Sequence, residues 1–183
     1  SGAGFGLFAI LAIASLFGGA FALDDRSQLI GGAIALALVA VGLLSSTLHL
    51  ANSRNAWRAV TQFRYSWLSR EAVLAVLFFP IAALHVAIPY ANAPDYLRVP
   101  IAITGIALAW GILFCTGMIY ACLKTIPQWN SRVVPLGYFV LGHWSGSLIA
   151  VAIAALDDRD LGGYIALCAG LLVASGIVKI AYY

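Results

Sequence analysis

The chain has 183 residues, of which 63% are hydrophobic and only 9% are charged, and its formal net charge is +3. Soluble domains carry about 25% charged residues, so the composition excludes a soluble globular protein and indicates an integral membrane protein. The basic residues collect in short segments beside apolar runs, which is a signal of membrane topology and gives no reason to expect nucleic-acid binding.

Long apolar runs follow one another along the sequence, separated by short polar breaks. No run alternates in polarity over about ten residues as a barrel strand does, so we expect helices, each with about 20 apolar residues to cross the hydrocarbon core. Six segments qualify: 4–23, 29–50, 71–90, 99–123, 134–156 and 161–182. Because short connections join them, we predict an all-α integral membrane protein, with residues 1–183 forming one antiparallel transmembrane helix bundle.

Small and helix-breaking residues inside these spans suggest how the helices pack. Gly142 with Gly146, and Gly170 with Ala174, are pairs of small residues one turn apart. Such pairs let helices approach closely in lipid, so we expect a close helix contact at each. Pro80 lies inside the third span, where it should kink the helix or free a carbonyl.

The distribution of basic residues predicts the orientation. The second and fourth breaks share one side of the membrane and hold six basic residues, whereas the other three breaks hold three among six aspartates. Cytoplasmic loops are enriched in Lys and Arg, so we place the second and fourth breaks in the cytoplasm. Their basic residues are Arg54, Arg58, Arg64, Arg70, Lys124 and Arg132.

The histidines are the residues that could bind haem, and their depths argue against it. Two axial histidines must lie at the same level. His49 ends the second span, His143 lies about 14 Å deeper and His85 about 20 Å deep at the helical rise. We therefore expect no haem, and for His143 a packed, hydrogen-bonded position with Ser147 one turn on. The cysteines lie inside apolar runs without a C-x-x-C motif, so we expect no metal site.

His49 and Ser45 lie one helical turn apart at the end of the second span. An imidazole near the membrane boundary can hydrogen-bond a quinone carbonyl and exchange a proton near neutral pH. An interfacial histidine bonded to a serine or a backbone carbonyl is the structural alternative, and position alone leaves both open.

Glu71 is the only glutamate in the sequence, and it opens the third span. An acid in the first helical turn complements the helix dipole. A carboxyl at membrane depth is costly and often functional, so the other interpretation is a proton relay between a buried site and the cytoplasm. Tyr120 ends the fourth span on the same side of the membrane.

The segment between the second and third spans carries four arginines. Arg54 and Arg58 are four residues apart, which suits a short interfacial helix, and Arg64 and Arg70 follow. The segment could anchor lipid headgroups or dock a soluble subunit, and composition does not separate the two.

Several motifs resemble the membrane anchor subunit of dimethyl sulfoxide reductase and its relatives. They are H-L-A-N-S-R-N-A-W-R-A at 49–59, S-W-L-S-R-E at 66–71, M-I-Y-A at 118–121 and T-I-P-Q-W at 125–129. The resemblance runs over essentially the whole sequence. The family is expected to have eight spans, so six here suggest a truncated anchor, trimmed at its start and lacking C-terminal helices.

The resemblance implies a three-subunit complex in the cytoplasmic membrane of a bacterium or archaeon. A molybdopterin catalytic subunit and an iron–sulfur subunit with [4Fe-4S] clusters would exchange electrons with a quinone, menaquinone or ubiquinone, bound by the anchor without haem. The family's quinol-site histidine falls on His49 and its acid on Glu71. The family's glycine, proline and arginine in this turn are here Ala51, Ser53 and Asn55.

The expected function is therefore to pass electrons between an iron–sulfur subunit and the quinone pool, without catalysing the molybdenum chemistry. We expect His49, Glu71, Tyr120 and Ser45 to bind the quinone, and the four arginines to dock the partner. The predicted cytoplasmic placement of the arginine-rich loop favours the sulfite dehydrogenase branch. The residues of the motifs N-A-W-R-A and S-W-L-S-R-E also resemble that branch more closely. A dimethyl sulfoxide or polysulfide reductase-type anchor that oxidises quinol is the alternative. A small transporter or channel is another class, for which Pro80 and His143 are the only hints.

Overall fold

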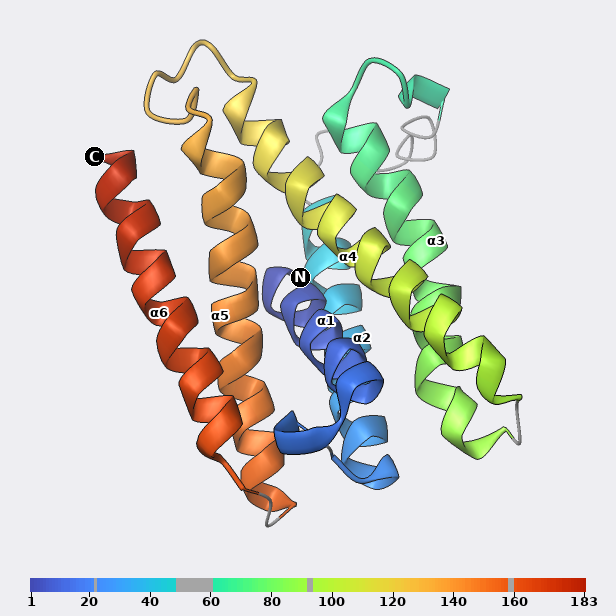
Figure 1. Cartoon of the computed structure of the whole chain (residues 1–183). Helices are drawn as coiled ribbons and strands as arrows, with labels where there is room; N and C mark the ends of the chain where they lie inside the picture. The colour runs from blue at the N-terminus through green and yellow to red at the C-terminus, as the bar shows by residue number, and fades with distance from the viewer. Residues whose placement is uncertain (22, 49–60, 92–93, 158–159) are drawn as a thin grey trace.

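The computed structural model describes residues 1–21, 23–48, 61–91, 94–157 and 160–183, and these residues contain helices and no strand (Figure 1). Three 3-10 turns, η1 (Gly19–Phe21), η3 (Ile88–Tyr90) and η4 (Asp95–Leu97), lie between α-helices. The α-helices are α1 (Gly2–Phe17), α2 (Asp25–Leu48), α3 (Trp67–Ala87), α4 (Arg98–Ala121), α5 (Val133–Leu156) and α6 (Gly162–Tyr182). The predicted all-α bundle is thereby confirmed.

Five of these helices, α2 to α6, are long and apolar enough to cross a membrane. The first helix differs from the predicted span 4–23, because α1 has only 16 residues and ends at Phe17. Gly18 and Gly19 follow with φ of 60° and 64°, a left-handed conformation that glycine adopts at low cost and that ends a right-handed helix. A continuous apolar run therefore contains a helix end that hydropathy does not reveal.

The short helix α1 forms the centre of the bundle. Ten of its 16 residues are buried, and it packs against α5, α2 and α4. The crossing with α5 is close because a Cβ on Gly6 would collide with the carbonyl oxygen of Gly142, and one on Gly146 with the backbone of Leu7. The predicted contact at Gly142 and Gly146 is confirmed. The one expected at Gly170 differs, because no described atom lies within 4 Å of a Cβ built there.

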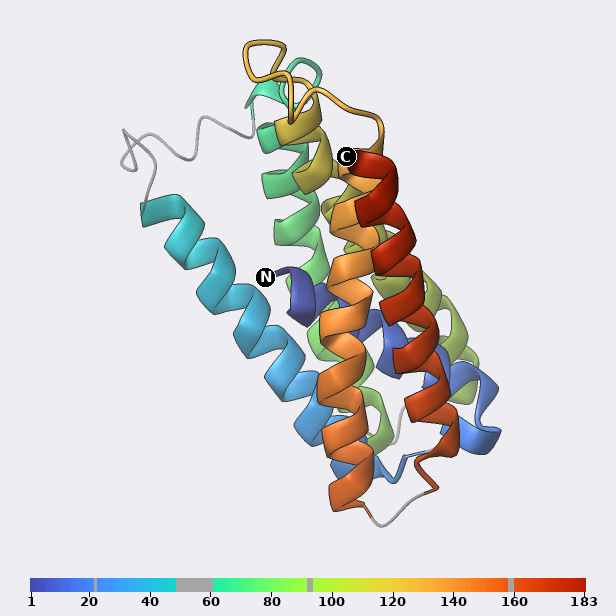
Figure 2. The ribbon, with the colours of Figure 1, turned by 90° about the vertical axis from the view of Figure 1, so that its left-hand side faces the viewer.

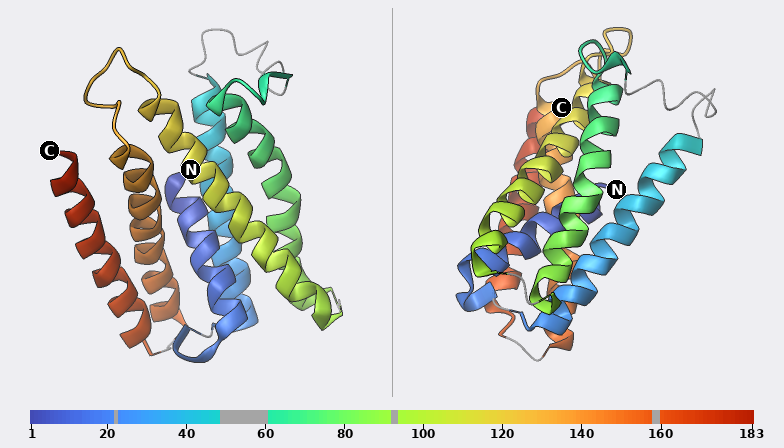
Figure 3. Two further views of the ribbon diagram at one scale, coloured as in Figure 1. Left: turned by 45° about the horizontal axis from the view of Figure 1, so that its top comes forward. Right: turned by 90° about the vertical axis from the view of Figure 1, so that its right-hand side faces the viewer.

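Successive helices run antiparallel, so the loops gather at two ends of the bundle (Figure 1). We call the end that carries residues 61–66 and 122–132 the basic end, because it displays Arg64, Lys124 and Arg132. The terminus at Tyr183 also lies there, and α1 begins at mid-height (Figures 1 and 3). The helix α2 diverges from its neighbours as it approaches Leu48 at this end, as views from two opposite sides show (Figure 2 and the right panel of Figure 3).

At the opposite end, hydrogen bonds between loops and helices hold α1, α2, α5 and α6 together. The hydroxyl of Tyr164, which is fully buried, donates to the carbonyl oxygen of Phe21 at 2.8 Å. The backbone N–H of Asp24 donates to Asp157 Oδ2 at 3.3 Å. These ties fix the helices at the end remote from the loops of the basic end.

Candidate functional site

A carboxyl group links α3 to α4 inside the basic end of the bundle. The Ser66 side chain accepts a hydrogen bond from the N–H of Ser69 at 3.4 Å and caps α3, so the helix begins at Trp67 and Glu71 lies in its second turn. The role predicted for a first-turn acid is therefore wrong, because the dipole acts on the first turn. Instead, Glu71 Oε1 lies 2.7 Å from Oγ1 of Thr116 on α4.

Aromatic rings continue this polar contact toward α5. Tyr120 follows Thr116 by one turn and shares its face of α4. Its ring stacks on that of Tyr138 on α5, with centroids 5.3 Å apart and planes 10° apart, and meets the edge of Trp129 at 5.3 Å and 86°. Tyr138 and Glu71 are close enough to interact electrostatically. We call Glu71, Thr116, Tyr120, Trp129 and Tyr138 the basic-end cluster.

A groove of about 810 Å³ opens beside the aromatic part of this cluster. The start of α1, the end of α4 and the facing sides of α5 and α6 form its walls. Tyr120, Trp129 and Tyr138 line one part of it, and Trp144 and Val178 belong to its apolar walls. Ligand sites are typically 300–1,000 Å³ with mostly apolar walls and a few polar groups, so the groove has the size and lining for an amphipathic molecule.

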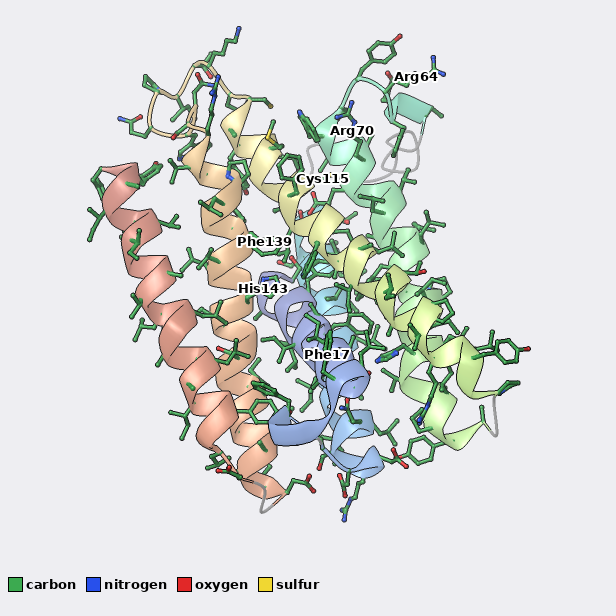
Figure 4. All side chains as sticks on the ribbon, in the orientation of Figure 1. Phe17, Arg64, Arg70, Cys115, Phe139 and His143 are labelled. Atoms are coloured by element: carbon green, nitrogen blue, oxygen red, sulfur yellow. The ribbon has the colours of Figure 1, made fainter. Side chains whose placement is uncertain are left out.

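The guanidinium of Arg70 binds the loop that precedes α3. Its Nε donates to the carbonyl oxygen of Phe63 at 3.1 Å, and its Nη2 donates to that of Arg64 at 2.9 Å. Its Cζ also lies 4.1 Å from the ring centroid of Trp67. Arg70 therefore holds the preceding loop onto the start of α3, whereas the Arg64 side chain is exposed at the basic end (Figure 4).

Part of the predicted site lies outside the described residues. His49, Arg54 and Arg58 belong to residues 49–60, which the structure does not describe, so their roles stay predictions. Ser45 is exposed near the end of α2, where this helix diverges from the others (Figure 2). Of the four residues predicted to bind a quinone, the structure brings Glu71 and Tyr120 into one cluster, and the role of Ser45 stays a prediction.

His143 is a packed, hydrogen-bonded residue, as the sequence predicted. Its side chain is 7% exposed, its Nε2 accepts a hydrogen bond from the indole of Trp110 at 3.0 Å, and its Nδ1 lies 2.8 Å from the carbonyl oxygen of Phe139 (Figure 4). A neutral ring with its proton on Nδ1 satisfies both contacts. The partner differs from the expected Ser147, whose hydroxyl donates to the carbonyl oxygen of Trp144 instead.

Sequence reasoning missed Thr116 and Trp110, the two partners that α4 supplies. Their contacts depend on how α4 is rotated against α3 and α5, which no local pattern specifies. For Thr116 one signal was present, since it lies one turn before Tyr120 and so on the same helix face.

The fold and the cluster together define a class: a multi-pass helical membrane protein with a carboxyl–aromatic cluster and an adjoining apolar groove at its basic end. The family model described as DMSO reductase anchor subunit (DmsC) matches residues 1–181. The protein therefore belongs to the dimethyl sulfoxide reductase anchor subunit family, which confirms the resemblance seen in its motifs.

Named relatives agree with this membership. A sulfite dehydrogenase subunit of Allochromatium vinosum is 30% identical over 192 aligned positions, covering 97% of this chain and 59% of the relative. An anaerobic dimethyl sulfoxide reductase chain of Escherichia coli is 26% identical, covering 96% of this chain and 62% of the relative. The sequence thus spans about three fifths of the length of these relatives. No solved structure matches.

Proposed function

We propose that this protein is the quinone-binding part of a membrane anchor subunit, which passes electrons between an iron–sulfur subunit and the membrane quinone pool. The observation that carries the proposal is the basic-end cluster, in which a carboxyl and two stacked tyrosines lie beside a groove of about 810 Å³. Family membership supports the same conclusion.

A quinone combines a flat ring with carbonyl oxygens and an apolar tail, and the groove offers a surface for each part. The hydroxyls of Tyr120 and Tyr138 can donate hydrogen bonds to carbonyl oxygens, and the walls formed by α5 and α6 can cover the tail. A bound quinone takes up or releases two electrons and two protons. His49 would exchange a proton at one carbonyl, Glu71 would relay it, and Tyr120 would position the ring.

The electrons would reach the quinone from a partner docked on the basic end. The exposed Arg64 side chain, with the exposed Phe63 and Tyr65 rings beside it, supports a docking surface there, and Lys124 and Arg132 on the neighbouring loop add positive charge. In the proposed complex this partner carries [4Fe-4S] clusters and connects to a molybdopterin catalytic subunit. The charge distribution supports a cytoplasmic position for this end.

We further propose that the complex oxidises sulfite and reduces the quinone. This direction is supported by the similarity to the sulfite dehydrogenase subunit of Allochromatium vinosum and by the proposed cytoplasmic docking side. A transporter is not favoured, because neither of the two features that suggested one marks a broken helix or an unpaired polar group. The helix α3 continues through Pro80, and His143 has its two ring nitrogens engaged by Trp110 and Phe139.

The proposal is tested by replacing the histidine expected to exchange the proton. We expect the change His49→Ala in the assembled complex to abolish quinone-linked turnover while dye-linked oxidation by the catalytic subunit is unchanged. The matched control is His85→Ala, because His85 lies in the last turn of α3 at the opposite end of the bundle. Unchanged quinone-linked turnover in the His49 variant would contradict the proposal.

A further inference from the structure

The hydroxyl of Thr116 lies at hydrogen-bond distance from two oxygen atoms. Its Oγ1 is 2.7 Å from Glu71 Oε1 and 2.9 Å from the carbonyl oxygen of Ile112, one turn earlier on the same helix. A threonine hydroxyl has a single proton to donate but can also accept hydrogen bonds. The carbonyl of Ile112 can only accept, so the protonation state of Glu71 decides whether both contacts are hydrogen bonds.

The other helical threonines show where this proton goes when no carboxyl is near. Thr104 donates to the carbonyl oxygen of Pro100 at 2.7 Å, and Thr47 donates to that of Leu43 at 2.8 Å. Both are bonds to the residue one turn earlier. If Thr116 makes the same bond to Ile112, its oxygen can only accept from Glu71, and Glu71 must then carry a proton.

We propose that Glu71 is protonated in this arrangement and that Thr116 is the positioning residue that holds the proton-bearing carboxyl. The protonated carboxyl donates to Thr116, which donates to Ile112, so both short contacts become hydrogen bonds. With an ionised Glu71, the single hydroxyl proton would serve only one of the two oxygens. Two oxygen atoms in close contact without a proton between them repel each other through their lone pairs, so two bonds in series are the favoured arrangement.

The charged and titratable groups around Glu71 come from four helices or their ends. They are the amino group of Ser1 before α1, Arg70 on α3, Cys115 on α4 and Tyr138 on α5. Arg70 directs its guanidinium at two loop carbonyls, and Figure 4 places it nearer the basic end than Cys115. The hydroxyl of Thr116 is therefore the group in hydrogen-bond contact with the carboxyl among the described residues.

This inference rests on the proposed function, because a protonated Glu71 is useful only if it relays protons for a quinone. A proton relay must hold a proton and then release it. On release, the Thr116 hydroxyl can rotate from Ile112 toward the carboxylate and stabilise the anion. Thr116 thus keeps one donated bond in either state. One proton leaves Glu71 and one returns from water at the basic end, and no electron moves in this step.

Infrared spectroscopy of the assembled complex tests the inference without a quinone reaction. We expect a protonated-carboxyl C=O band, identified by its shift between H₂O and D₂O, that is lost in Glu71→Gln. In Thr116→Val the band should move to higher frequency, because the carboxyl loses its acceptor. Thr116→Ser should restore the native band, since serine keeps the hydroxyl. Thr104→Val, which removes a similar back-bond on the same helix, should leave the band in place.

Two outcomes would overturn the inference: a spectrum in which Glu71→Gln removes no such band, or a band whose frequency is unchanged in Thr116→Val. Either result leaves the proposed quinone site standing if His49→Ala still abolishes quinone-linked turnover. Conversely, the expected band shifts together with normal turnover in Glu71→Gln would contradict the proton relay and support the Thr116 contact.

Discussion

The two ends of the bundle use their acidic side chains in different ways. At the end remote from the basic-end cluster, Asp24 accepts a hydrogen bond from the N–H of Ser27 at 2.7 Å at the start of α2, and Asp157 accepts one from the N–H of Asp24. Acids in such places stabilise helix starts and loops. Glu71 lies beyond the first turn of α3 and contacts the hydroxyl of another helix, so capping does not explain it.

The cavities at the two ends also differ, both in their volume and in the residues that line them. The remote end has a cavity of about 230 Å³ lined by Asp25, Gln28, His85 and Arg98 among apolar residues, so charges of both signs meet around a small space. The groove at the basic end is larger, about 810 Å³, and joins apolar walls to stacked tyrosines. Only the second combination suits a flat ring with an apolar tail.

The largest expected difference between the ends concerns the carboxyls. We expect Glu71→Gln to lower quinone-linked turnover about 100-fold, because proton transfer by a positioned side chain contributes about 10²–10⁴-fold. The amide is isosteric, so the midpoint of thermal unfolding in detergent should change little. Asp24→Asn is the matched control: it should leave turnover unchanged. Equal turnover losses in the two variants would remove the distinction between the ends.

Much of the fold was predictable from hydropathy, because the apolar runs of α2 to α6 coincide with single helices. The end of α1 was not, since Gly18 and Gly19 stop the helix within an apolar run. The small-residue pairs show the same limit. Gly142 and Gly146 meet α1, but Gly170 has open space around it among the described residues, because such a pair permits a helix contact without specifying a partner.

The candidate site was predictable only as far as residue chemistry is local. Glu71 stood out as the only glutamate in an apolar sequence, and Tyr120 through its position at the end of a span. Thr116 as the partner of Glu71, and Trp110 as the partner of His143, depend on the rotation of α4 against its neighbours. That rotation follows from the packing of the whole bundle, which short sequence patterns do not encode.

The hydrogen bond between Trp110 and His143 can be used to distinguish polar groups that stabilise the bundle from polar groups that act on a ligand. We expect Trp110→Phe to lower the free energy of unfolding by about 2 kcal/mol, because the buried Nε2 of His143 loses its donor. Quinone-linked turnover per folded complex should be unchanged. Adding His143→Leu should recover part of the stability, since both polar partners are then absent. A fall in turnover at native stability would instead place His143 in the working site.

The stacked tyrosines sharpen the comparison at the level of ligand binding. We expect Tyr120→Leu to raise the KM for quinone about tenfold, since losing a hydroxyl and a ring contact removes about 1.4 kcal/mol of binding. Dye-linked turnover should not change. Tyr138→Phe keeps the stacked ring and removes only its own hydroxyl, so it should show a smaller increase. A KM that stays at the native value in Tyr120→Leu would contradict a ligand in the groove.

The smallest expected effect lies at the remote end, where the Tyr164 hydroxyl donates to the carbonyl oxygen of Phe21. We expect Tyr164→Phe to reduce the free energy of unfolding by about 1 kcal/mol, the usual contribution of one hydrogen bond. The ring stays to pack on Phe21, 5.2 Å between centroids, so the loss reports on the hydrogen bond alone. Because this bond connects the turn after α1 to α6 on the side away from the basic-end cluster, KM and turnover should keep their native values. If this variant instead raised the KM for quinone as much as Tyr120→Leu does, the groove would depend on the placement of α6 at its far end, and the two ends could no longer be treated as independent.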